Sequence, residues 1–268
     1  MKKKQIIDLS VPIKAGIASD PETQLPQIYY SDHAAGAHQM VSVFPGLNIK
    51  DLPNEQGWAV ENLKINTHAG THIDAPYHYH AFDDSGNPMP TIDEIPLDWF
   101  FGPGVKLDFR KFEDGHVVTA DEIKEELERI EYELQPGDIV LVNTTAGERY
   151  GDDNYLDSGC GVGREGTLYL TEHGVRLVGT DAWSWDTPFN FMRKRFEETE
   201  DPSTIWEGHF AGRIRPYCQI EKLGNLDKLP PTGFQVIALP VNIYKASAGW
   251  VRPVAIIDEN GGEQVWPE

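Results

Sequence analysis

Cysteine is nearly absent from this sequence of 268 residues. Its two cysteines, Cys160 and Cys218, lie far apart in the chain and cannot supply the disulfide framework of a small secreted domain. A chain with so few cysteines is typical of a reducing compartment, so the expected location is the cytoplasm.

Basic residues are also few, because 23 Lys and Arg stand against 43 Asp and Glu. The resulting formal net charge of −20 repels phosphate backbones and anionic lipid headgroups within a Debye length of the surface. We therefore expect neither a nucleic acid nor a membrane surface as a partner.

Long apolar runs are missing as well. No segment approaches the roughly 20 apolar residues of a membrane-spanning helix. The opening "MKKKQIIDLSVPIKAG" has the positive start of an export signal, but Asp8 and Ser10 interrupt its apolar stretch. The sequence therefore predicts neither a membrane span nor an export signal.

The composition that remains is that of a globular protein rich in loops, with 40% hydrophobic residues, 25 Gly and 19 Pro. Strand-like runs, β-branched and alternating or wholly apolar, occur at seven places. They span residues 5–13, 61–67, 104–109, 138–145, 175–181, 234–243 and 250–258.

Helical signals are fewer. Residues 119–134 form the clearest helix, with a capping box of Thr119 and Glu122 and a stop at Pro136-Gly137, and residues 167–174 form a shorter helix closed by Gly174. Residues 14–57 and 146–166 are expected to be long loops that could line a pocket, and the "GCGVG" of the second lacks the Lys-Ser/Thr of a phosphate-binding loop. Strands and helices interleave without a strict βαβ repeat, which indicates one α/β domain over residues 1–268 with a mixed β-sheet core and flanking helices.

The segment "NTHAGTHIDAPYHYH", residues 66–80, holds four of the nine histidines. Gly70, the β-branched residues beside it and Pro76 favour an extended chain over a helix. In full extension His68 and His72 would lie ~13 Å apart, so the chain must bend at Gly70 for both to reach one cation. His72 and Asp74, two residues apart on one face, need no such bend.

Two histidines and a carboxylate suit zinc, manganese or ferrous iron. Three protein ligands leave a coordination position open, which is typical of a catalytic site. Any one of these histidines alone is more often a surface or hydrogen-bonded core residue, and His80 keeps that interpretation. The cluster as a set predicts a metal site.

The motif "HAGTHIDAPYH", residues 68–78, resembles the His-x-Gly-Thr-His-x-Asp-x-Pro-x-His signature of the cyclase-type metal-dependent amidohydrolases, the family of bacterial kynurenine formamidase and isatin hydrolase. All seven fixed positions of the signature match. The segments "IIDLSVPI", "GVRLVGTDAWSWD" and "HFAGRIRPYCQIEKLGNLDKLP" resemble further parts of the family more weakly. The resemblance implies the swivelling β/β/α-like cyclase fold.

The resemblance also assigns roles to residues. It implies that His68, His72 and Asp74 bind the metal and that His78 donates and accepts protons. His209 and Glu221 stand at the spacing of a second metal site in the formamidase branch. One or two ions, Zn2+ or Mn2+, are therefore expected.

The expected reaction is hydrolysis of an amide C–N bond in a small aromatic N-formyl or cyclic amide. The ion would lower the pKa of water toward ~7 and polarise the carbonyl, while His78 moves protons. Aromatic residues are candidate pocket walls, since apolar pockets hold planar rings. They are Phe44, Trp58, Trp183 and Trp185.

Other interpretations of the sequence stay open. The same ion could stabilise an enolate in a cyclase or dehydratase. A non-catalytic metal-binding protein would not need His78. Arg213 or Arg215 could hold a substrate carboxylate, although a solvated salt bridge is the commoner role. By resemblance, we expect a homodimer or homotetramer.

Overall fold

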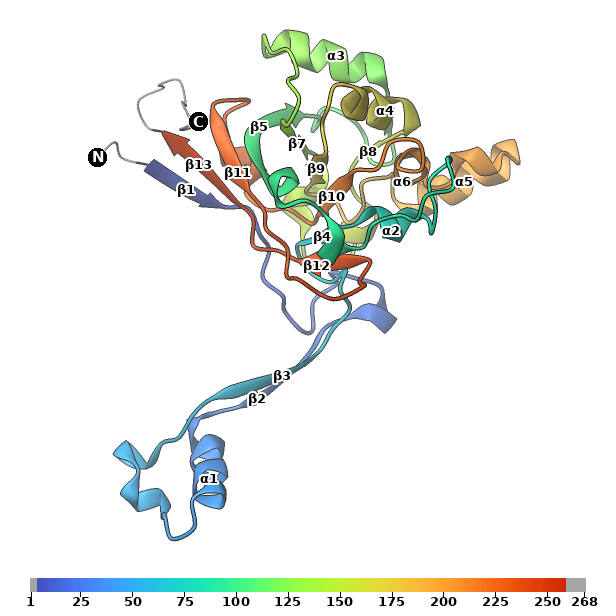
Figure 1. Ribbon diagram of the computed structural model, residues 1–268. Helices are drawn as coiled ribbons and strands as arrows, with labels where there is room; N and C mark the ends of the chain where they lie inside the picture. Colours follow the sequence, from blue (N-terminus) through green and yellow to red (C-terminus); the bar gives the residue numbers. More distant parts are fainter. Residues whose placement is uncertain (1–3, 259–268) are drawn as a thin grey trace.

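The computed structural model describes residues 4–258, and Figure 1 shows its ribbon. Its strands are β1 Lys4–Asp8, β2 Gln27–Ser31, β3 Val60–Lys64, β4 His72–Asp74, β5 Phe101–Asp108, β6 Val117–Val118, β7 Ile139–Asn143, β8 Gly161–Val162, β9 Leu177–Thr180, β10 Cys218–Glu221, β11 Phe234–Ile237, β12 Ala248–Trp250 and β13 Val254–Asp258. Its α-helices are α1 His33–Val43, α2 Pro76–Tyr79, α3 Ala120–Arg129, α4 Arg164–Glu172, α5 Phe189–Thr199 and α6 Glu207–Ala211.

Nine of these strands form one sheet in the order β1-β13-β11-β5-β7-β9-β10-β4-β12. The central strands β5, β7, β9 and β10 pair in parallel. The outer pairs on both sides, from β1 to β5 and from β10 to β12, are antiparallel. The chain is a single α/β domain around a large, curled mixed sheet, and the predicted fold class is confirmed.

The centre of the sheet is apolar on both faces, as parallel strands require. All five residues of β7 are buried. Ile139 and Leu141 point into one hydrophobic cluster, whereas Val140 and Val142 point into the other. The second cluster also takes in Ile123 of α3 and Leu170 of α4, so these helices cover that face of the sheet.

Helix α3 begins where the sequence predicts and ends earlier. The side chain of Thr119 accepts a hydrogen bond from the backbone N–H of Glu122, and the Glu122 carboxylate accepts from the backbone N–H of Thr119. The predicted end at residue 134 is wrong, because the helix stops at Arg129 and the chain turns through Glu131 at a φ of 53°. Leu134 is nevertheless buried.

The prediction of a loop over residues 14–57 is wrong for its larger part. Strand β2 pairs antiparallel with β3 over all five residues of each, and α1 lies between them at the far end. Figure 1 shows this ribbon standing off the body of the molecule with α1 at its tip. We call residues 27–64 the arm. The predicted strand over residues 61–67 lies partly in it, because β3 ends at Lys64.

Residues 146–163 contain only short elements, as expected of a long loop, whereas residues 164–166 of the predicted loop already belong to α4. Two turns of 3-10 helix, Thr145–Arg149 and Tyr155–Asp157, precede β8, which pairs with β6. Three elements that the sequence analysis did not identify, β10, α5 and α6, follow β9. In the described part of the chain, no helix has the length and hydrophobicity to cross a bilayer.

Candidate metal centre

The histidine cluster lies where β4 meets its neighbours. All three residues of β4 are buried between β10 and β12. Just before this strand the chain bends at Gly70, whose φ of 64° is a conformation that glycine adopts without strain. Pro76 occupies the first turn of α2, a position where its missing N–H costs nothing, and the helix places His78 over Asp74.

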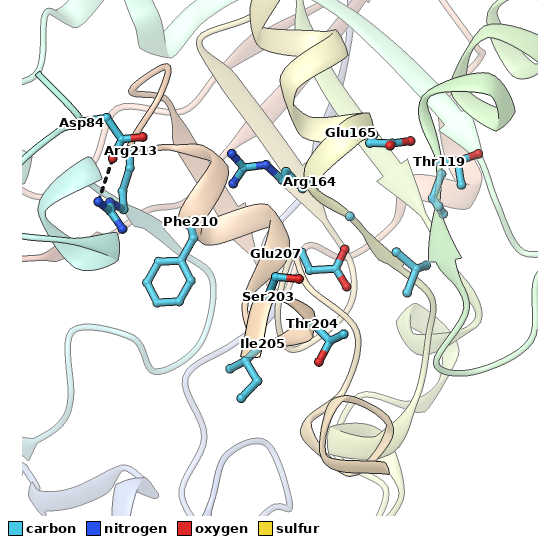
Figure 2. Close-up of a pocket in the computed structure, with 13 residues that line it drawn as sticks. Asp84, Thr119, Arg164, Glu165, Ser203, Thr204, Ile205, Glu207, Phe210 and Arg213 are labelled. Atoms are coloured by element: carbon cyan, nitrogen blue, oxygen red, sulfur yellow. Dashed lines mark ion pairs between the residues drawn. The ribbon is translucent and has the colours of Figure 1, made fainter. Parts of the chain in front are cut away.

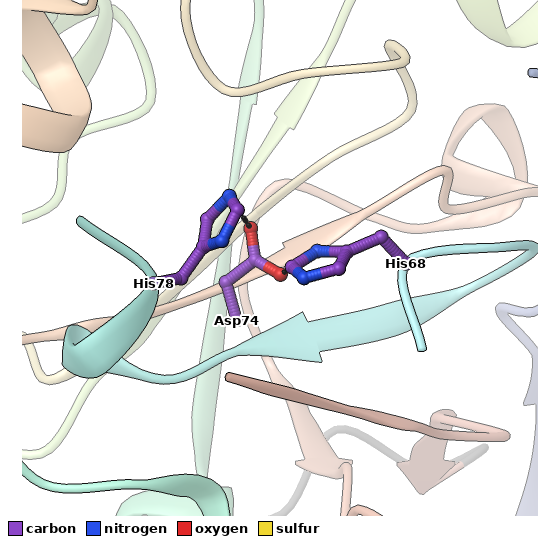
Figure 3. A group of neighbouring side chains, drawn as sticks. All are labelled: His68, Asp74 and His78. Atoms are coloured by element: carbon purple, nitrogen blue, oxygen red, sulfur yellow. Dashed lines mark ion pairs between the residues drawn. The ribbon is translucent and has the colours of Figure 1, made fainter. Parts of the chain in front are cut away.

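Asp74 is the centre of the cluster, as Figure 3 shows. Its Oδ1 lies 2.8 Å from His68 Nδ1 and 3.2 Å from His72 Nε2. Its Oδ2 lies 3.8 Å from His78 Nε2. The bend at Gly70 therefore brings His68 and His72 to one carboxylate oxygen.

Strand β10 and helix α6 contribute the second half of the cluster. Glu221 is the register partner of His72, and its Oε2 lies 3.5 Å from His72 Nε2. His209 Nε2 lies 3.8 Å from Glu221 Oε1 and 4.0 Å from Asp74 Oδ2. The structure thus brings together the six residues that the sequence analysis assigned to metal binding and proton transfer, namely His68, His72, Asp74, His78, His209 and Glu221.

Hydrogen bonds fix the tautomers of two imidazoles. His72 Nδ1 lies 2.9 Å from the Gly70 carbonyl oxygen, which can only accept, so Nδ1 carries the proton. His209 Nδ1 likewise donates to Asp186 Oδ2 at 2.5 Å. Both rings therefore present an unprotonated Nε2 to the carboxylates, the arrangement found in metal-binding histidines.

Two buried atoms at the centre have no hydrogen-bond partner. They are His72 Nε2 and Asp74 Oδ1. Since the proton of His72 is on Nδ1, two lone pairs face each other across 3.2 Å in a fully buried place. Such a contact is repulsive unless a cation lies beside it. The residues therefore fit a divalent ion.

Among the described residues, two groups have ligand atoms close enough together for one ion. The first is His68, Asp74 and His78, of which the two histidines line the cavity, and the second is the buried set His72, Asp74 and Glu221. Asp74 belongs to both groups. It is the natural bridge if two ions bind.

The surroundings shift the pKa values of the Asp74 and Glu221 carboxylates in opposite directions. Burial acts to raise the pKa of Asp74, but the surrounding His68, His78 and His72 outweigh it and hold that pKa well below its usual range. Burial, reinforced by the charge of Asp74, raises the pKa of Glu221 well above its usual range. A cation at the centre would remove this conflict between adjacent buried carboxylates.

Burial also acts on the imidazoles. It lowers the pKa of His72 despite the opposing charge of Asp74. It lowers the pKa of His78 to about 4, again against Asp74, with His68 and His209 adding to the effect. Both rings are therefore neutral near pH 7, so each has a lone pair for an ion or a proton.

Three residues at the centre were missed in the sequence. Gln219 Nε2 lies 3.2 Å from Asp74 Oδ2 and 3.1 Å from Glu221 Oε1, so the amide bridges both carboxylates. Its position two residues before Glu221 places it on the same face of a strand, a signal that required β10 to be identified. Asp186, which orients His209, and Trp206 lie in irregular segments without a periodic signal.

A cavity of about 300 Å3 opens onto the cluster. Its lining includes His68 and His78 together with the aromatic rings of Trp183, Phe189 and Trp206. The indole of Trp206 stacks on the His209 ring at 4.4 Å between centroids, with the backbone of Trp206 held at a φ of 53°. Left-handed backbone at a bulky residue is strained and is commonly retained at functional sites.

The root of the arm forms part of the cavity rim. Asp20 and Gln24 line it from before β2, and Asn66 lines it from after β3. The Lys222 ammonium forms an ion pair with Asp20 and donates a hydrogen bond to the His68 carbonyl oxygen at 2.8 Å. Among the described residues, none of 146–166 lines this cavity.

Three of the four predicted aromatic walls lie elsewhere. Phe44 and Trp58 are on the arm and do not line the cavity, because β2 and β3 carry the tip away from the body. Trp185 is a core residue whose indole N–H donates to Thr167 Oγ1 at 2.9 Å. Its backbone N–H does reach the site, donating to Glu221 Oε1 at 3.0 Å. Only Trp183 stands where the sequence analysis expected.

The two arginines considered as carboxylate ligands point to other partners. Arg213 pairs with Asp84 at 2.7 Å, and Arg215 Nε lies 3.9 Å from Glu172. All four side chains are about half-exposed. Both pairs match the salt-bridge alternative.

A larger cavity of about 700 Å3 is lined in part by Glu207 and Phe210 of α6 and is shown in Figure 2. Its lining mixes acidic and basic side chains, including Glu207, Arg164 and the Asp84–Arg213 pair. None of the clustered histidines lines it. The chemistry of the molecule is therefore concentrated in the smaller cavity.

Comparison with known proteins agrees with this geometry. The model of the Cyclase family matches residues 7–187. The chain belongs to the Cyclase family. It is 30% identical over 233 residues to the kynurenine formamidase of Paracidovorax citrulli, covering 83% of this chain and 94% of that protein.

Solved structures share the fold. A crystal structure of an isatin hydrolase bound to the product analogue thioisatinate superposes with a TM-score of 0.74 at 18% identity, covering 96% of this chain and 93% of that one. Isatin hydrolase A from Ralstonia solanacearum gives a TM-score of 0.72 at 22% identity, with 95% and 92% covered. At this level of identity the likeness shows the cyclase fold.

Proposed function

We propose that this member of the Cyclase family is a metal-dependent hydrolase that cleaves the amide C–N bond of a small aromatic N-formyl or cyclic amide. The observation that carries the proposal is the pair of buried, unpartnered atoms His72 Nε2 and Asp74 Oδ1 beneath a cavity lined by aromatic rings. Its relatives include a kynurenine formamidase by sequence and isatin hydrolases by fold, and both kinds of enzyme hydrolyse amides.

In this proposal His68, His72 and Asp74 hold a divalent ion, Zn2+ or Mn2+. His209 and Glu221 hold a second ion where one binds, with Asp74 between the two. A bound ion supplies a Lewis acid that lowers the pKa of water and polarises an amide carbonyl. The bonds from His72 to Gly70 and from His209 to Asp186 keep both Nε2 atoms directed at this place.

His78 is the proton carrier of the proposal. Its Nε2 faces Asp74 Oδ2 at 3.8 Å, and its ring lies 4.2 Å from that of His68 between centroids. Because its pKa is lowered to about 4, it is neutral at pH 7 and can accept the proton of the attacking water. It then returns that proton to the departing nitrogen.

The cavity favours a planar substrate. Trp183, Phe189 and Trp206 offer ring faces and edges, and a volume of about 300 Å3 holds one small bicyclic molecule. We further propose a cytoplasmic location, supported by Cys160 and Cys218, which are both free and buried.

Hydrolysis of a panel of amides tests the proposal. The protein is purified without chelator, its metal content is measured, and N-formylkynurenine, isatin and related aryl amides and lactams are supplied in water enriched in oxygen-18. We expect bound zinc or manganese, hydrolysis that stops on chelation and returns with metal, and one labelled oxygen in the product. Unlabelled product would indicate a cyclase or dehydratase, and activity that survives metal removal would overturn the proposal.

A further inference from the structure

One lysine is buried beside the candidate metal centre. Lys222 follows Glu221 directly after β10, and its side chain is 1% exposed. Its ammonium forms an ion pair with Asp20 and donates a hydrogen bond to the His68 carbonyl oxygen at 2.8 Å. A buried ion pair contributes little net stability, because both charges lose their hydration. We therefore expect this pair to have a role other than stabilising the fold.

The backbone at Lys222 has an uncommon conformation. Its φ is 59°, in a region that residues with a Cβ rarely adopt. Two hydrogen bonds hold it there, because its N–H donates to the Ala182 carbonyl oxygen at 3.0 Å and its carbonyl oxygen accepts from Thr71 Oγ1 at 2.7 Å. Backbone of this kind persists where the surrounding structure imposes it, and it is concentrated at active sites and ligand-binding sites.

The residues that contact this ammonium all line the cavity of about 300 Å3. They are Asp20, His68 and Trp183, and Lys222 lines it as well. Asp20 accepts a hydrogen bond from the indole Nε1 of Trp183 at 3.3 Å, and Lys222 Nζ lies 5.9 Å from the centroid of that ring. The Asp20 carboxylate therefore fixes both the ammonium and the aromatic wall beside it.

The ammonium has a donor to spare. A lysine ammonium carries three N–H groups. Among residues 4–258, its hydrogen-bond acceptors are Asp20 Oδ1 and the His68 carbonyl oxygen. The third N–H is therefore available to an oxygen atom of a molecule held in the cavity.

Charge decides which kind of oxygen this donor favours. Asp20 neutralises Lys222, and the site also holds the carboxylates of Asp74 and Glu221. One divalent ion balances those two carboxylates, which leaves no net positive charge for an anion. Burying a further carboxylate there is costly, whereas a carbonyl oxygen loses less hydration and gains a charge-assisted hydrogen bond. The spare donor therefore matches a neutral acceptor such as a ketone.

We propose that Lys222 is a specificity-determining residue, whose ammonium donates a hydrogen bond to a second, neutral carbonyl oxygen on the ring of an aryl amide substrate. His68 connects the two ends of this arrangement, since its ring contacts Asp74 at 2.8 Å and its backbone carbonyl binds the ammonium. Both substrate oxygens therefore belong to one small molecule. Asp20 is the positioning residue. The inference rests on the proposed amide hydrolysis and narrows its substrate class.

Three formamides that share one ring and one scissile bond test the proposal. Formanilide has hydrogen beside the formamide, 2-acetylformanilide has a neutral ketone there, and N-formylanthranilate has a carboxylate. Lys222→Met should lower kcat/KM for the acetyl compound by about 10–100-fold, the range of a hydrogen bond to a charged group, and change the other two much less. An equal loss for all three would make Lys222 a structural support of His68 and overturn the proposal. A loss confined to N-formylanthranilate would overturn the neutral acceptor.

Lys106→Met is the matched control. Lys106 is also buried and donates to a backbone carbonyl, that of Leu229 at 2.5 Å, but it does not line the cavity. It should leave the ratios among the three formamides unchanged. The double variant Asp20→Asn/Lys222→Met contains no unpaired carboxylate at residue 20. It should show the same loss as Lys222→Met and serves if the single variant does not fold.

Ligand binding provides a readout that needs no turnover. 2-Aminoacetophenone carries the ring and the ketone without a scissile bond, and aniline lacks the ketone. Isothermal titration should show that Lys222→Met weakens binding of 2-aminoacetophenone by about 10–100-fold and leaves aniline unchanged. If the natural chain hydrolyses none of the formamides, the proposed function fails, and this titration still decides the role of Lys222. Equal affinities of both proteins for 2-aminoacetophenone would overturn the inference.

Discussion

Asp74 is the residue on which the candidate site depends, because it contacts both groups of ligands. Its Oδ1 contacts His68 and His72. Its Oδ2 lies near His78 and His209 and accepts a hydrogen bond from the amide of Gln219. A full negative charge is maintained there, since the imidazoles keep its pKa well below the usual range. At this position a carboxamide could not replace the carboxylate.

The role of His78 gives the first prediction. His78→Ala should lower kcat by about 10²–10⁴-fold, the usual contribution of a general acid or base, and leave the bound metal in place. His80→Ala is the control, because His80 is exposed and bonds only to the Phe82 backbone. Steady-state kinetics and metal analysis on both variants check this. Loss of metal from His78→Ala would make His78 a ligand instead.

Asp181 gives a prediction about stability and pH. It is buried at the end of β9, where burial raises its pKa to about 7 against hydrogen bonds from Thr144 and Asn143. Its folded pKa lies above its unfolded value of 3.8, so the folded state binds the extra proton. The contribution of Asp181 to stability is therefore complete below pH ~4 and is lost as pH rises toward ~7.

Comparison with Asp181→Asn measures this contribution, because the variant cannot titrate. Between pH ~4 and ~7 the natural protein should lose on the order of 2–4 kcal/mol of unfolding free energy relative to the variant, with no further change above that range. Urea unfolding at a series of pH values provides the curves. Parallel curves would show that Asp181 stays ionised throughout.

At the scale of elements, the bend at Gly70 is what allows His68 and His72 to reach the same carboxylate oxygen of Asp74. A Cβ at this residue would lie 2.8 Å from Ile13 Cγ1, in addition to the strain of a φ of 64°. Gly70→Ala should therefore cost about 2 kcal/mol of unfolding free energy, more than the ~1 kcal/mol of left-handed backbone alone. It should also weaken metal binding, because His68 and His72 flank the bend.

Gly16→Ala is the matched control for the bend. Gly16 has a φ of 78°, but nothing lies within 4 Å of a Cβ built there. It should show the backbone cost of about 1 kcal/mol and unchanged metal affinity. Isothermal titration with Mn2+ and denaturant unfolding compare the two variants. Equal metal affinities in both would show that metal binding does not depend on the bend at Gly70.

Elements with a strong local signal were predictable from the sequence. The capping box at Thr119 and the apolar run of β7 are local features, and both the start of α3 and strand β7 lie where the sequence predicts them. The histidine motif alone located five residues of the site within eleven positions. They are His68, Gly70, His72, Asp74 and His78. These signals require no knowledge of distant parts of the chain.

Features that depend on distant parts of the chain were missed. Strand β10, with Gln219, pairs with β4 and β9 and has little alternation of its own. Phe44 and Trp58 looked like pocket residues because aromatic side chains commonly line pockets, yet β2 and β3 carry them away. Helix α3 ends early because the chain turns at Glu131. The sequence around Glu131 favours a helix and gives no signal of this turn.

At the scale of the whole molecule, metal binding and stability are linked. The buried groups His72, Asp74 and Glu221 keep an unfavourable arrangement that a cation relieves, so the ion should stabilise the folded state. Chelation should lower the melting temperature, with a stabilisation of about 4 kcal/mol at a thousandfold excess of metal over its dissociation constant. His72→Ala should melt at one temperature with or without chelator. A natural protein insensitive to chelation would contradict the link.

The root of the arm borders the site. Gln24, three residues before the arm begins, and Asn66, two residues after it ends, both line the cavity. The ion pair of Lys222 with Asp20 holds the same root against the backbone of His68.

The most direct test is an anomalous difference map from crystals grown with manganese. The account predicts a peak between His68, His72 and Asp74, about 2 Å from each ligand atom, with a coordination position open toward His78. Absence of a peak there in manganese-grown crystals at neutral pH, with the three side chains pointing apart, would contradict it.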